Sequence, residues 1–243
     1  MVLLVTGAAG FVAATLVETA AARGARVVAV DRAAPPADLA AAWSAQPGRV
    51  AVEVADVRDG GALADLMRRH GVRRLVHGAA ITSGPAREAA SPAEIMEINL
   101  VGTLRAIEAM RSAGLERAVV LSSASAYGAA AYAGDRLDEE ATVCRPETLY
   151  AVSKFAAERA ARRVADLAGL DLRVVRLTAV FGPWERDTGV RDTLSPPFQA
   201  TRLALRGEPA ILARPGRRDW IYSRDVAAAV LAVLDAAAPV PPV

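Results

Sequence analysis

A tyrosine and a lysine lie four residues apart in the segment Tyr150-Ala-Val-Ser-Lys154. In a helix this spacing brings the phenol and the ammonium group onto one face. A phenol with its ordinary pKa of about 10 is a poor base at neutral pH, and a nearby positive charge favours its ionised form. Lys154 is the single lysine among the 29 lysine and arginine residues, which marks this position as one that needs a compact amine. The pair predicts a site in which Tyr150 transfers a proton.

Hydroxyl side chains come shortly before this pair. Ser122, Ser123 and Ser125 lie at the end of an apolar segment, residues 115–122, that predicts a strand. In open α/β sheets, ligands bind beyond the carboxyl ends of the strands. We therefore expect one of these serines to hydrogen-bond the reacting oxygen of a substrate.

A glycine-spaced segment, Thr6-Gly-Ala-Ala-Gly-Phe-Val-Ala13, lies between a predicted strand and a predicted helix. Gly7 permits a tight turn, and Gly10 lets the backbone come close to a pyrophosphate, with Phe11 and Val12 next in the chain. The free N–H groups at the start of the following helix favour phosphate. In this context the segment predicts a dinucleotide site.

Asp31 ends the second predicted strand, 24 residues after Gly7. A carboxylate at this place can accept hydrogen bonds from both ribose hydroxyls of NAD and repels the 2′-phosphate of NADP. The neighbouring Arg32 could instead hold that phosphate. We expect NAD as the cofactor, with NADP as the less favoured alternative.

Short apolar segments alternate with longer helical patterns along most of the chain. The apolar segments are continuous, as strands covered on both faces require. Ser91, Pro92 and Glu94 form a capping box that predicts a helix to about residue 113, and Gly169 ends a helix predicted over 149–168. The predicted strands cover residues 1–6, 26–31, 49–54, 73–77, 115–122 and 172–177, and the first predicted helix covers residues 10–23.

This strand–helix–strand repetition predicts an α/β fold with a Rossmann-like, doubly wound parallel sheet. We expect residues 1–181 to form the NAD-binding Rossmann domain that carries the catalytic residues. Five prolines between residues 182 and 215 break the pattern. Residues 182–243 are therefore expected to form a small, irregular substrate-binding lobe, partly interleaved with the Rossmann sheet.

Composition and charge exclude several classes of protein. The net charge of the 243 residues is +2 and the arginines are interspersed with acids, so we expect no nucleic-acid partner. The chain has one cysteine, Cys144, so it has no internal disulfide, and we expect a reducing, cytoplasmic location. With only two histidines besides this cysteine there is no zinc-type set of ligands, so we expect no metal. The uncharged first 17 residues lack the basic start of a signal peptide, and no apolar run reaches the ~18 residues of a membrane span.

Several further motifs follow one another in an order typical of one family. They are VADVRD with Asp56-Val57, HGAA (77–80), NLVGT (99–103), SSASAYG (122–128), RLTAVFGP (176–183) and RRDWIYSRDVA (217–227). With the glycine-spaced segment and the Tyr150–Lys154 pair, they make nearly all of the chain similar to the extended short-chain dehydrogenases/reductases of the NAD-dependent epimerase/dehydratase family. The resemblance implies hydride transfer between nicotinamide and a sugar-like secondary alcohol, expected on a nucleotide-sugar.

The resemblance also implies roles for individual residues. Ser123 would be the catalytic hydroxyl, Tyr150 the acid or base, and Lys154 the group that binds the cofactor's ribose and activates Tyr150. For Asn99 a buried structural role is an equal alternative to cofactor binding, and His77 is expected to be structural. The residues expected to contact the cofactor are Gly7, Gly10, Phe11, Val12, Asp31, Arg32, Asp56, Val57, Ala79, Ala80, Ile81, Asn99, Ser122, Tyr150 and Lys154.

Substrate contacts are expected from Ser123, Ser125 and Arg218, which matches the arginine that family members use toward the diphosphate. The chain also departs from the family pattern. Ala179 replaces the asparagine that commonly contacts the nucleotide-sugar. Ala124 and Ser125 replace the acidic pair of the 4,6-dehydratases, so dehydration is disfavoured. Members commonly continue further, so the expected lobe is either truncated or short with an open substrate site.

These features predict an NAD-dependent sugar epimerase or oxidoreductase. Ala179 suggests an alternative, an NAD-dependent dehydrogenase of a free sugar or hydroxy acid. A non-enzymatic NAD-sensing protein on the same fold is an alternative of another class, because a fold does not determine a function.

A homodimer is also expected. The predicted helices over 91–113 and 149–168 resemble those through which family members pair. The second of them carries residues small enough for close helix approach, namely Ala156, Ala157, Ala160 and Ala161.

Overall fold

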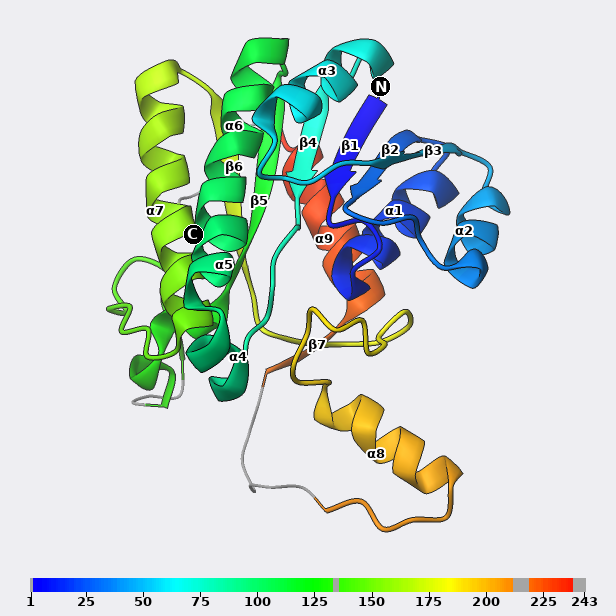
Figure 1. Cartoon of the computed structure of the whole chain (residues 1–243), viewed down its shortest axis with the longest axis vertical. Coiled ribbons are helices and arrows are strands. Elements are labelled where there is room, and N and C mark those ends of the chain that lie inside the picture. Colours follow the sequence, from blue (N-terminus) through cyan, green and yellow to red (C-terminus); the bar gives the residue numbers. More distant parts are fainter. Residues whose placement is uncertain (1, 133–135, 212–218, 238–243) are drawn as a thin grey trace.

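The computed structural model describes residues 2–132, 136–211 and 219–237. Its central feature is a six-stranded parallel sheet with the strand order β3-β2-β1-β4-β5-β6 (Figure 1). This is the order of a doubly wound Rossmann fold, so the predicted fold class is confirmed. The strands are β1 (Val2–Thr6), β2 (Arg26–Asp31), β3 (Arg49–Val54), β4 (Arg74–His77), β5 (Arg117–Ser123) and β6 (Asp171–Leu177).

The strand order reverses at β1, which pairs with β2 on one side and with β4 on the other. At the end of β1, Thr6 lies opposite Val30 of β2 and His77 of β4. The crossovers leave in opposite directions here, which opens a crevice beyond the carboxyl ends of the strands. Residues 7–10, hereafter the glycine turn, follow β1 directly and therefore lie at this crevice.

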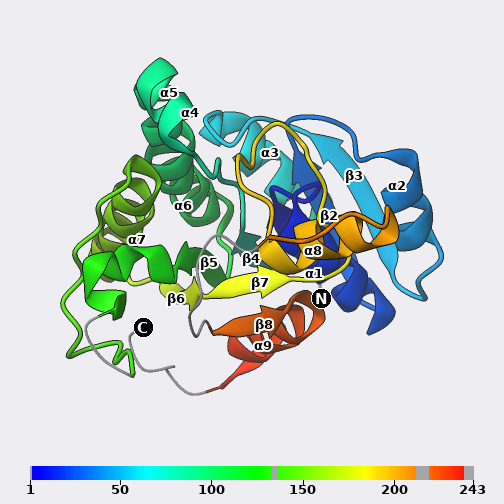
Figure 2. The same ribbon diagram turned by 90° about the horizontal axis from the view of Figure 1, so that it is seen from below.

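Helices cover both faces of the sheet (Figures 1 and 2). Successive residues of each strand serve two separate cores: Leu3 and Val5 belong to one, and Val2 and Leu4 to the other. Because both faces are covered, the inner strands β1, β2, β4 and β5 are buried along most of their length, which explains their continuous apolar pattern. The first core is shared with α1 (Phe11–Ala22), α2 (Ala37–Ser44) and α9 (Ser223–Asp235), and the second with α3 (Gly60–His70) and α6 (Gly102–Ala113).

The helix predicted over 149–168 is confirmed as α7 (Leu149–Ala168), which packs beside α6 against β5 and β6. The Thr148 hydroxyl accepts a hydrogen bond from Ala151 N at 3.1 Å and so caps the helix start. Gly169 ends the helix with φ +64°, a backbone conformation that favours glycine. Local signals at both ends thus determine where this helix begins and stops.

The helix predicted from Ser91 to residue 113 is divided. The chain forms α4 (Pro85–Ala90), α5 (Pro92–Met96), a π-helical turn η1 (Glu97–Val101) and then α6. The predicted capping box is wrong, because the Ser91 side chain makes no capping hydrogen bond. Ser91 also ends α4 by donating its N–H to Arg87 O at 2.8 Å, so its backbone cannot take the usual cap geometry.

The chain after β6 is less regular. A two-stranded parallel sheet pairs β7 (Ala179–Phe181) with β8 (Trp220–Tyr222). Between them lie residues 183–195, hereafter the strap, and α8 (Pro196–Leu205), which projects from the rest of the molecule in Figure 1. Helix α9 falls within the predicted lobe but packs beside α1 on the large sheet. The division of the chain into two domains at residues 181 and 182 stays a prediction.

Two short 3₁₀ turns, η2 (Ala124–Tyr127) and η3 (Ala129–Tyr132), follow β5. Within the described part of the chain, no helix combines the length and the apolar composition needed to cross a lipid bilayer.

Candidate active site

Tyr150 lies in the first turn of α7, close to Ser123 at the end of β5. The side chains of Ser123 and of Thr82, which lies in the loop after β4, are near its phenol. Burial raises the pKa of Tyr150, and these two neighbouring hydroxyls and the charge of Arg191 offset only part of this effect. The phenol is therefore protonated at neutral pH, and Tyr150 is ready to donate a proton.

Lys154 lies one helical turn after Tyr150 and is buried, with 4% of its surface exposed. Its Nζ donates a hydrogen bond to Leu121 O of β5 at 2.6 Å. Burial lowers the pKa of Lys154 to about 8, and the negative charge of Glu158 opposes the decrease. Lys154 is not among the groups that shift the pKa of Tyr150, because its amine is turned toward the strand, so activation of Tyr150 by Lys154 stays a prediction. The cation that acts on Tyr150 is Arg191.

A buried ion pair lies below Lys154. Glu158, four residues further along α7, is 1% exposed and accepts hydrogen bonds from Arg176 Nη2 at 2.6 Å and Nε at 3.0 Å. Ser122 Oγ donates to the same carboxylate at 2.9 Å, so the hydroxyl of this predicted cofactor residue is engaged with α7. Ser122 and Arg176 are register partners on β5 and β6. The cluster fixes α7, and with it Tyr150, against the two strands.

Ser123, which is near Tyr150, is hydrogen-bonded to Ser125. Ser123 Oγ accepts a hydrogen bond from Ser125 Oγ at 2.9 Å and another from Ser125 N at 3.2 Å. Both serines are partly exposed, in contrast to the buried Ser122. The structure thus places the Ser123 hydroxyl near the phenol and joins it to the Ser125 hydroxyl.

The glycine turn is closely packed against the loop after β4. Gly7 has φ +69°, and a Cβ atom at this position would lie 2.6 Å from Ala79 Cα. No other residue type fits here without displacing backbone. Gly10 N donates to Gly7 O at 2.9 Å, and α1 then begins at Phe11, which is buried, and Val12, which is partly buried.

The Asp31 carboxylate is oriented toward the same turn. Its Oδ2 accepts a hydrogen bond from Ala9 N at 3.0 Å, and its Oδ1 accepts one from Arg32 N at 2.7 Å. The side chain of Asp31 is partly exposed, and Arg32 is exposed. Dinucleotide sites require a hydrogen-bond acceptor beside a glycine turn. The Asp31 carboxylate and the glycine turn have this arrangement and therefore fit such a cofactor.

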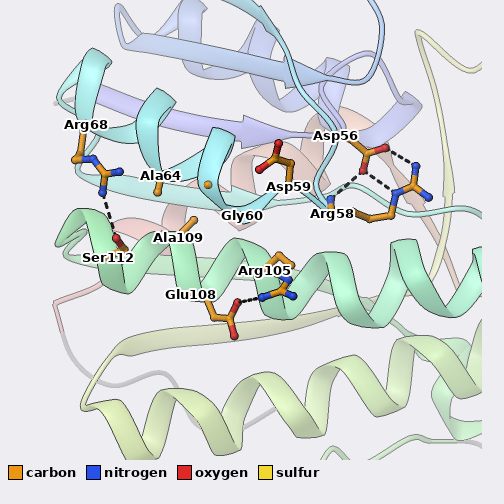
Figure 3. A pocket seen from close by; sticks show the side chains of 11 residues that line it. Asp56, Arg58, Asp59, Gly60, Ala64, Arg68, Arg105, Glu108, Ala109 and Ser112 are labelled. Atoms are coloured by element: carbon orange, nitrogen blue, oxygen red, sulfur yellow. Dashed lines mark hydrogen bonds and ion pairs between the residues drawn. The ribbon is translucent and has the colours of Figure 1, made fainter.

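Asp56 lies further along the same edge and is engaged by Arg58. Arg58 Nη2 is 2.6 Å from Asp56 Oδ2, and this interaction lowers the pKa of Asp56. Val57 is buried in the second core, where a Cβ on Gly102 would lie 2.8 Å from its Cγ2. Asp56 and Arg58 line one end of a cavity of about 740 Å³ between α3 and α6 (Figure 3). Tyr150 is not part of the lining.

Asn99 holds the loop after β4 in place. Its Oδ1 accepts a hydrogen bond from Ile81 N at 2.8 Å, and its Nδ2 donates to Ile81 O at 3.0 Å and to Ser153 Oγ of α7 at 2.9 Å. The Ile81 side chain is buried in the second core, whereas Ala79 and Ala80 remain partly exposed. These bonds are those of a structural clamp, and a contact of Asn99 with the cofactor stays a prediction.

His77 is buried between two threonines. Its Nδ1 lies 2.8 Å from Thr6 Oγ1, and its Nε2 lies 3.1 Å from Thr103 Oγ1. Burial, and to a lesser degree the charge of Lys154, lower the pKa of His77 to about 3, so the ring is neutral. It connects β1, β4 and α6, in agreement with the expected structural role.

The chain is similar to known proteins over almost its whole length. A family model described as the NAD dependent epimerase/dehydratase family matches residues 3–242. The chain belongs to this family. The predicted family is therefore confirmed, and with it the expectation of an NAD-dependent enzyme.

Three known proteins show how close the similarity is. Sterol demethylase protein B of Methylococcus capsulatus is 32% identical over 237 residues, which are 97% of this chain and 66% of that protein. The structure of MoeE5 in complex with UDP-glucose and NAD has 32% identity and a TM-score of 0.76, covering 97% of this chain and 72% of MoeE5. UDP-glucose 4-epimerase from Thermus thermophilus, in complex with NAD, has 30% identity and a TM-score of 0.81, covering 97% of this chain and 75% of the epimerase. The chain thus spans about two thirds to three quarters of these relatives.

Some residues of this family member were not found from the sequence. Thr82 lies near Tyr150, Arg191 acts on Tyr150 through its charge from a separate loop, and Glu158 acts in the same way on Lys154. The four-residue spacing of Lys154 and Glu158 on α7 was the one local signal for Glu158. Arg218, predicted to contact the substrate, lies outside the described residues.

Proposed function

We propose that this chain carries the cofactor-binding and catalytic parts of an NAD-dependent nucleotide-sugar epimerase, or of an oxidoreductase acting on the same class of alcohol. The observation that supports this most is the meeting of Tyr150, Ser123 and Thr82 at the carboxyl edge of the sheet. When bound, NAD accepts and returns a hydride. The residues proposed to hold it include Gly7, Gly10 and Asp31, whose arrangement fits a dinucleotide.

Tyr150 would take the proton of the substrate's secondary alcohol as that alcohol is oxidised, and return it on reduction. Ser123 would hydrogen-bond the same oxygen and orient it. Burial raises the pKa of Tyr150, and Arg191 offsets only part of this effect. Removal of the phenol proton would therefore need a further positive charge, which the nicotinamide ring of bound NAD would supply. Lys154, held by Leu121 O, is proposed to bind the ribose next to the reacting ring.

NAD is proposed rather than NADP. The Asp31 carboxylate already accepts two backbone hydrogen bonds at the end of β2, and its charge would repel a 2′-phosphate. Arg32 is exposed beside Asp31, and the less favoured binding of NADP depends on this one side chain.

The proposed substrate class is a nucleotide-sugar. It is supported by the solved relatives, MoeE5 with UDP-glucose and the UDP-glucose 4-epimerase. The two alternatives, a dehydrogenase of a free sugar or hydroxy acid and an NAD-sensing protein, are less well supported. None of the three relatives described is a dehydrogenase of a free sugar or hydroxy acid. An NAD-sensing protein would not need the hydroxyl groups near Tyr150.

We also propose a homodimer formed through α6 and α7. Ala157 and Ala161 are buried inside the chain, so they cannot face a partner, whereas Ala156 and Ala160 are partly exposed beside Val152, which is 36% exposed. Sedimentation equilibrium should give twice the 25.3 kDa chain mass, and a monomeric mass would contradict the proposal. A cytoplasmic location is likewise proposed, on the single cysteine.

The activity is tested with UDP-glucose and NAD. Nuclear magnetic resonance should show UDP-galactose forming, and Tyr150→Phe should lower the rate by about 10²–10⁴-fold while NAD binding persists. Tyr222→Phe, which removes a hydroxyl from β8, is the matched control. Soluble NADH in place of UDP-galactose would indicate the oxidoreductase, and full turnover by Tyr150→Phe would contradict the proposed chemistry.

A further inference from the structure

The strap is fastened to the loop after β4 by polar contacts. Thr82 N donates to Val190 O at 3.0 Å, and Asp192 N donates to Thr82 O at 3.1 Å, which forms a parallel bridge one residue long. The Asp192 carboxylate also holds the Arg87 guanidinium, with Nη2 at 2.7 Å and Nε at 3.0 Å. Arg191 lies at the centre of this bridge, so its backbone position is well defined.

The Arg191 side chain is held by the strap itself. Its Nη1 lies 3.0 Å from Glu185 Oε1, and its Nε donates to Thr193 O at 3.0 Å. Glu185 is in turn fixed by Ser195, whose N and Oγ each donate to its carboxylate at 2.6 Å. The guanidinium is therefore oriented before any ligand arrives, which reduces the conformational entropy that binding would cost.

The guanidinium is directed toward the cofactor side of the crevice. Its central carbon lies 5.0 Å from the centre of the Phe11 ring, at the start of α1 after the glycine turn. The Arg191 side chain is 24% exposed, whereas the Glu185 side chain is 0% exposed, so part of the guanidinium faces outward from the pair. Arg191 is thus close to the start of α1, and its charge also acts on Tyr150.

We propose that Arg191 binds the diphosphate of a nucleotide ligand, with the outward edge of its guanidinium donating to phosphate oxygens. The inference rests on the proposed function and adds to it a residue from the strap. An arginine presents its donors in a planar fork that matches phosphate, and such charge-assisted hydrogen bonds are about twice as strong as neutral ones. The diphosphate could be that of the dinucleotide or that of the nucleotide-sugar.

Calorimetric titration of the full chain separates these sources. NAD and UDP-glucose are titrated separately into the unaltered protein and into Arg191→Gln, Arg191→Lys and Arg202→Gln. We expect Arg191→Gln to weaken at least one ligand by about 10- to 100-fold. Arg191→Lys should recover part of the loss because it retains the charge. Arg202→Gln is the matched control, since Arg202 stacks on Phe198 of α8 with a similar separation of 5.6 Å.

Each outcome has a definite meaning. Weakening of NAD alone assigns Arg191 to the dinucleotide, weakening of UDP-glucose alone assigns it to the nucleotide-sugar, and either result supports the inference. Unchanged affinities in Arg191→Gln would overturn it while leaving the proposed function intact. Lack of binding by the unaltered chain would overturn both.

The competing interpretation is that Arg191 only neutralises Glu185. Glu185→Gln tests it, because this variant removes the carboxylate charge and keeps the cation. The inference requires Glu185→Gln to bind within about threefold of the unaltered protein, or more tightly. If Glu185→Gln weakened both ligands as much as Arg191→Gln does, the pair would be structural and the inference wrong.

Discussion

Helix α1, packed on the large sheet, and helix α8, which follows the strap, are opposite cases of helix formation. Eight of the 12 residues of α1 are buried, yet its N-terminal cap, Gly10, offers no side-chain hydrogen bond. None of the ten residues of α8 is buried, yet Ser195 caps it by accepting from Phe198 N at 3.3 Å, and Pro196 occupies the first turn. Capping and tertiary packing are therefore separate sources of helix stability.

The same difference extends to the regions around the two helices. The sheet region is stabilised by two apolar cores, one on each face. The strap is fastened mainly by backbone hydrogen bonds and by the ion pairs Arg87–Asp192 and Arg191–Glu185. Regions with few buried apolar contacts open at lower free energy than the core. We therefore expect substitutions in the sheet region to destabilise the fold, and those in the strap to act on binding.

Two glycines with the same backbone angle test this comparison most strongly. Gly7 and Gly189 both have φ +69°, but a Cβ would lie 2.6 Å from Ala79 Cα at the first and has no atom within 4 Å at the second. Gly189→Ala should lower the free energy of unfolding by about 1–2 kcal/mol, the cost of the left-handed backbone. Gly7→Ala should lower it by about 4 kcal/mol or more, because backbone must move.

Urea denaturation measures both values, and NAD titration of the folded variants adds a second comparison. Gly7→Ala should also abolish NAD binding, since the glycine turn can no longer form. Equal losses in the free energy of unfolding of the two variants would mean that the close approach of Gly7 to Ala79 does not contribute to stability. That result would contradict the expected difference between the sheet region and the strap.

Two leucines test the packing of the two helices. Leu16 of α1 is fully buried in the first core, whereas Leu205 of α8 is 83% exposed. Leu16→Ala should lower the free energy of unfolding by about 2–5 kcal/mol through lost burial and a residual cavity. Leu205→Ala should change it by no more than about 0.5 kcal/mol. A large loss in Leu205→Ala would show that α8 is covered in solution, for example by a second copy of the chain.

The sheet region could be predicted well from the sequence for a physical reason. Strands buried on both faces are continuously apolar, so β2 has the bounds that were predicted. The ends of α7 are determined by Thr148 and Gly169, which act through local geometry. Ser91 shows the limit of such local signals, because its backbone is already used by the helix before it.

The candidate site could be predicted only in part. The glycine turn and the Tyr150–Lys154 pair are short motifs whose spacing is visible in the sequence. Contacts between distant segments have no such signal: Arg191 meets Thr82 across more than 100 residues. The direction in which Lys154 points depends on the Leu121 carbonyl of β5, which no spacing on α7 reveals.

The pKa of Lys154 compares the two regions through one substitution in each. Because Lys154 is the only lysine, labelling lysine with ¹³C at Cε gives a single resonance from which this pKa is measured. Its pKa should be about 8 against an ordinary value of 10.5. The unfolded chain then binds more protons between these values, so stability rises with pH, by about 1 kcal/mol from pH 8 to 9.

Glu158→Gln should lower the pKa of Lys154 further, because Glu158 opposes the effect of burial. Glu208→Gln, an exposed change beyond α8, should leave it unaltered. A midpoint near 10 in the unaltered protein would mean that water reaches Lys154, and that the buried position of its amine beside Leu121 O does not exist in solution.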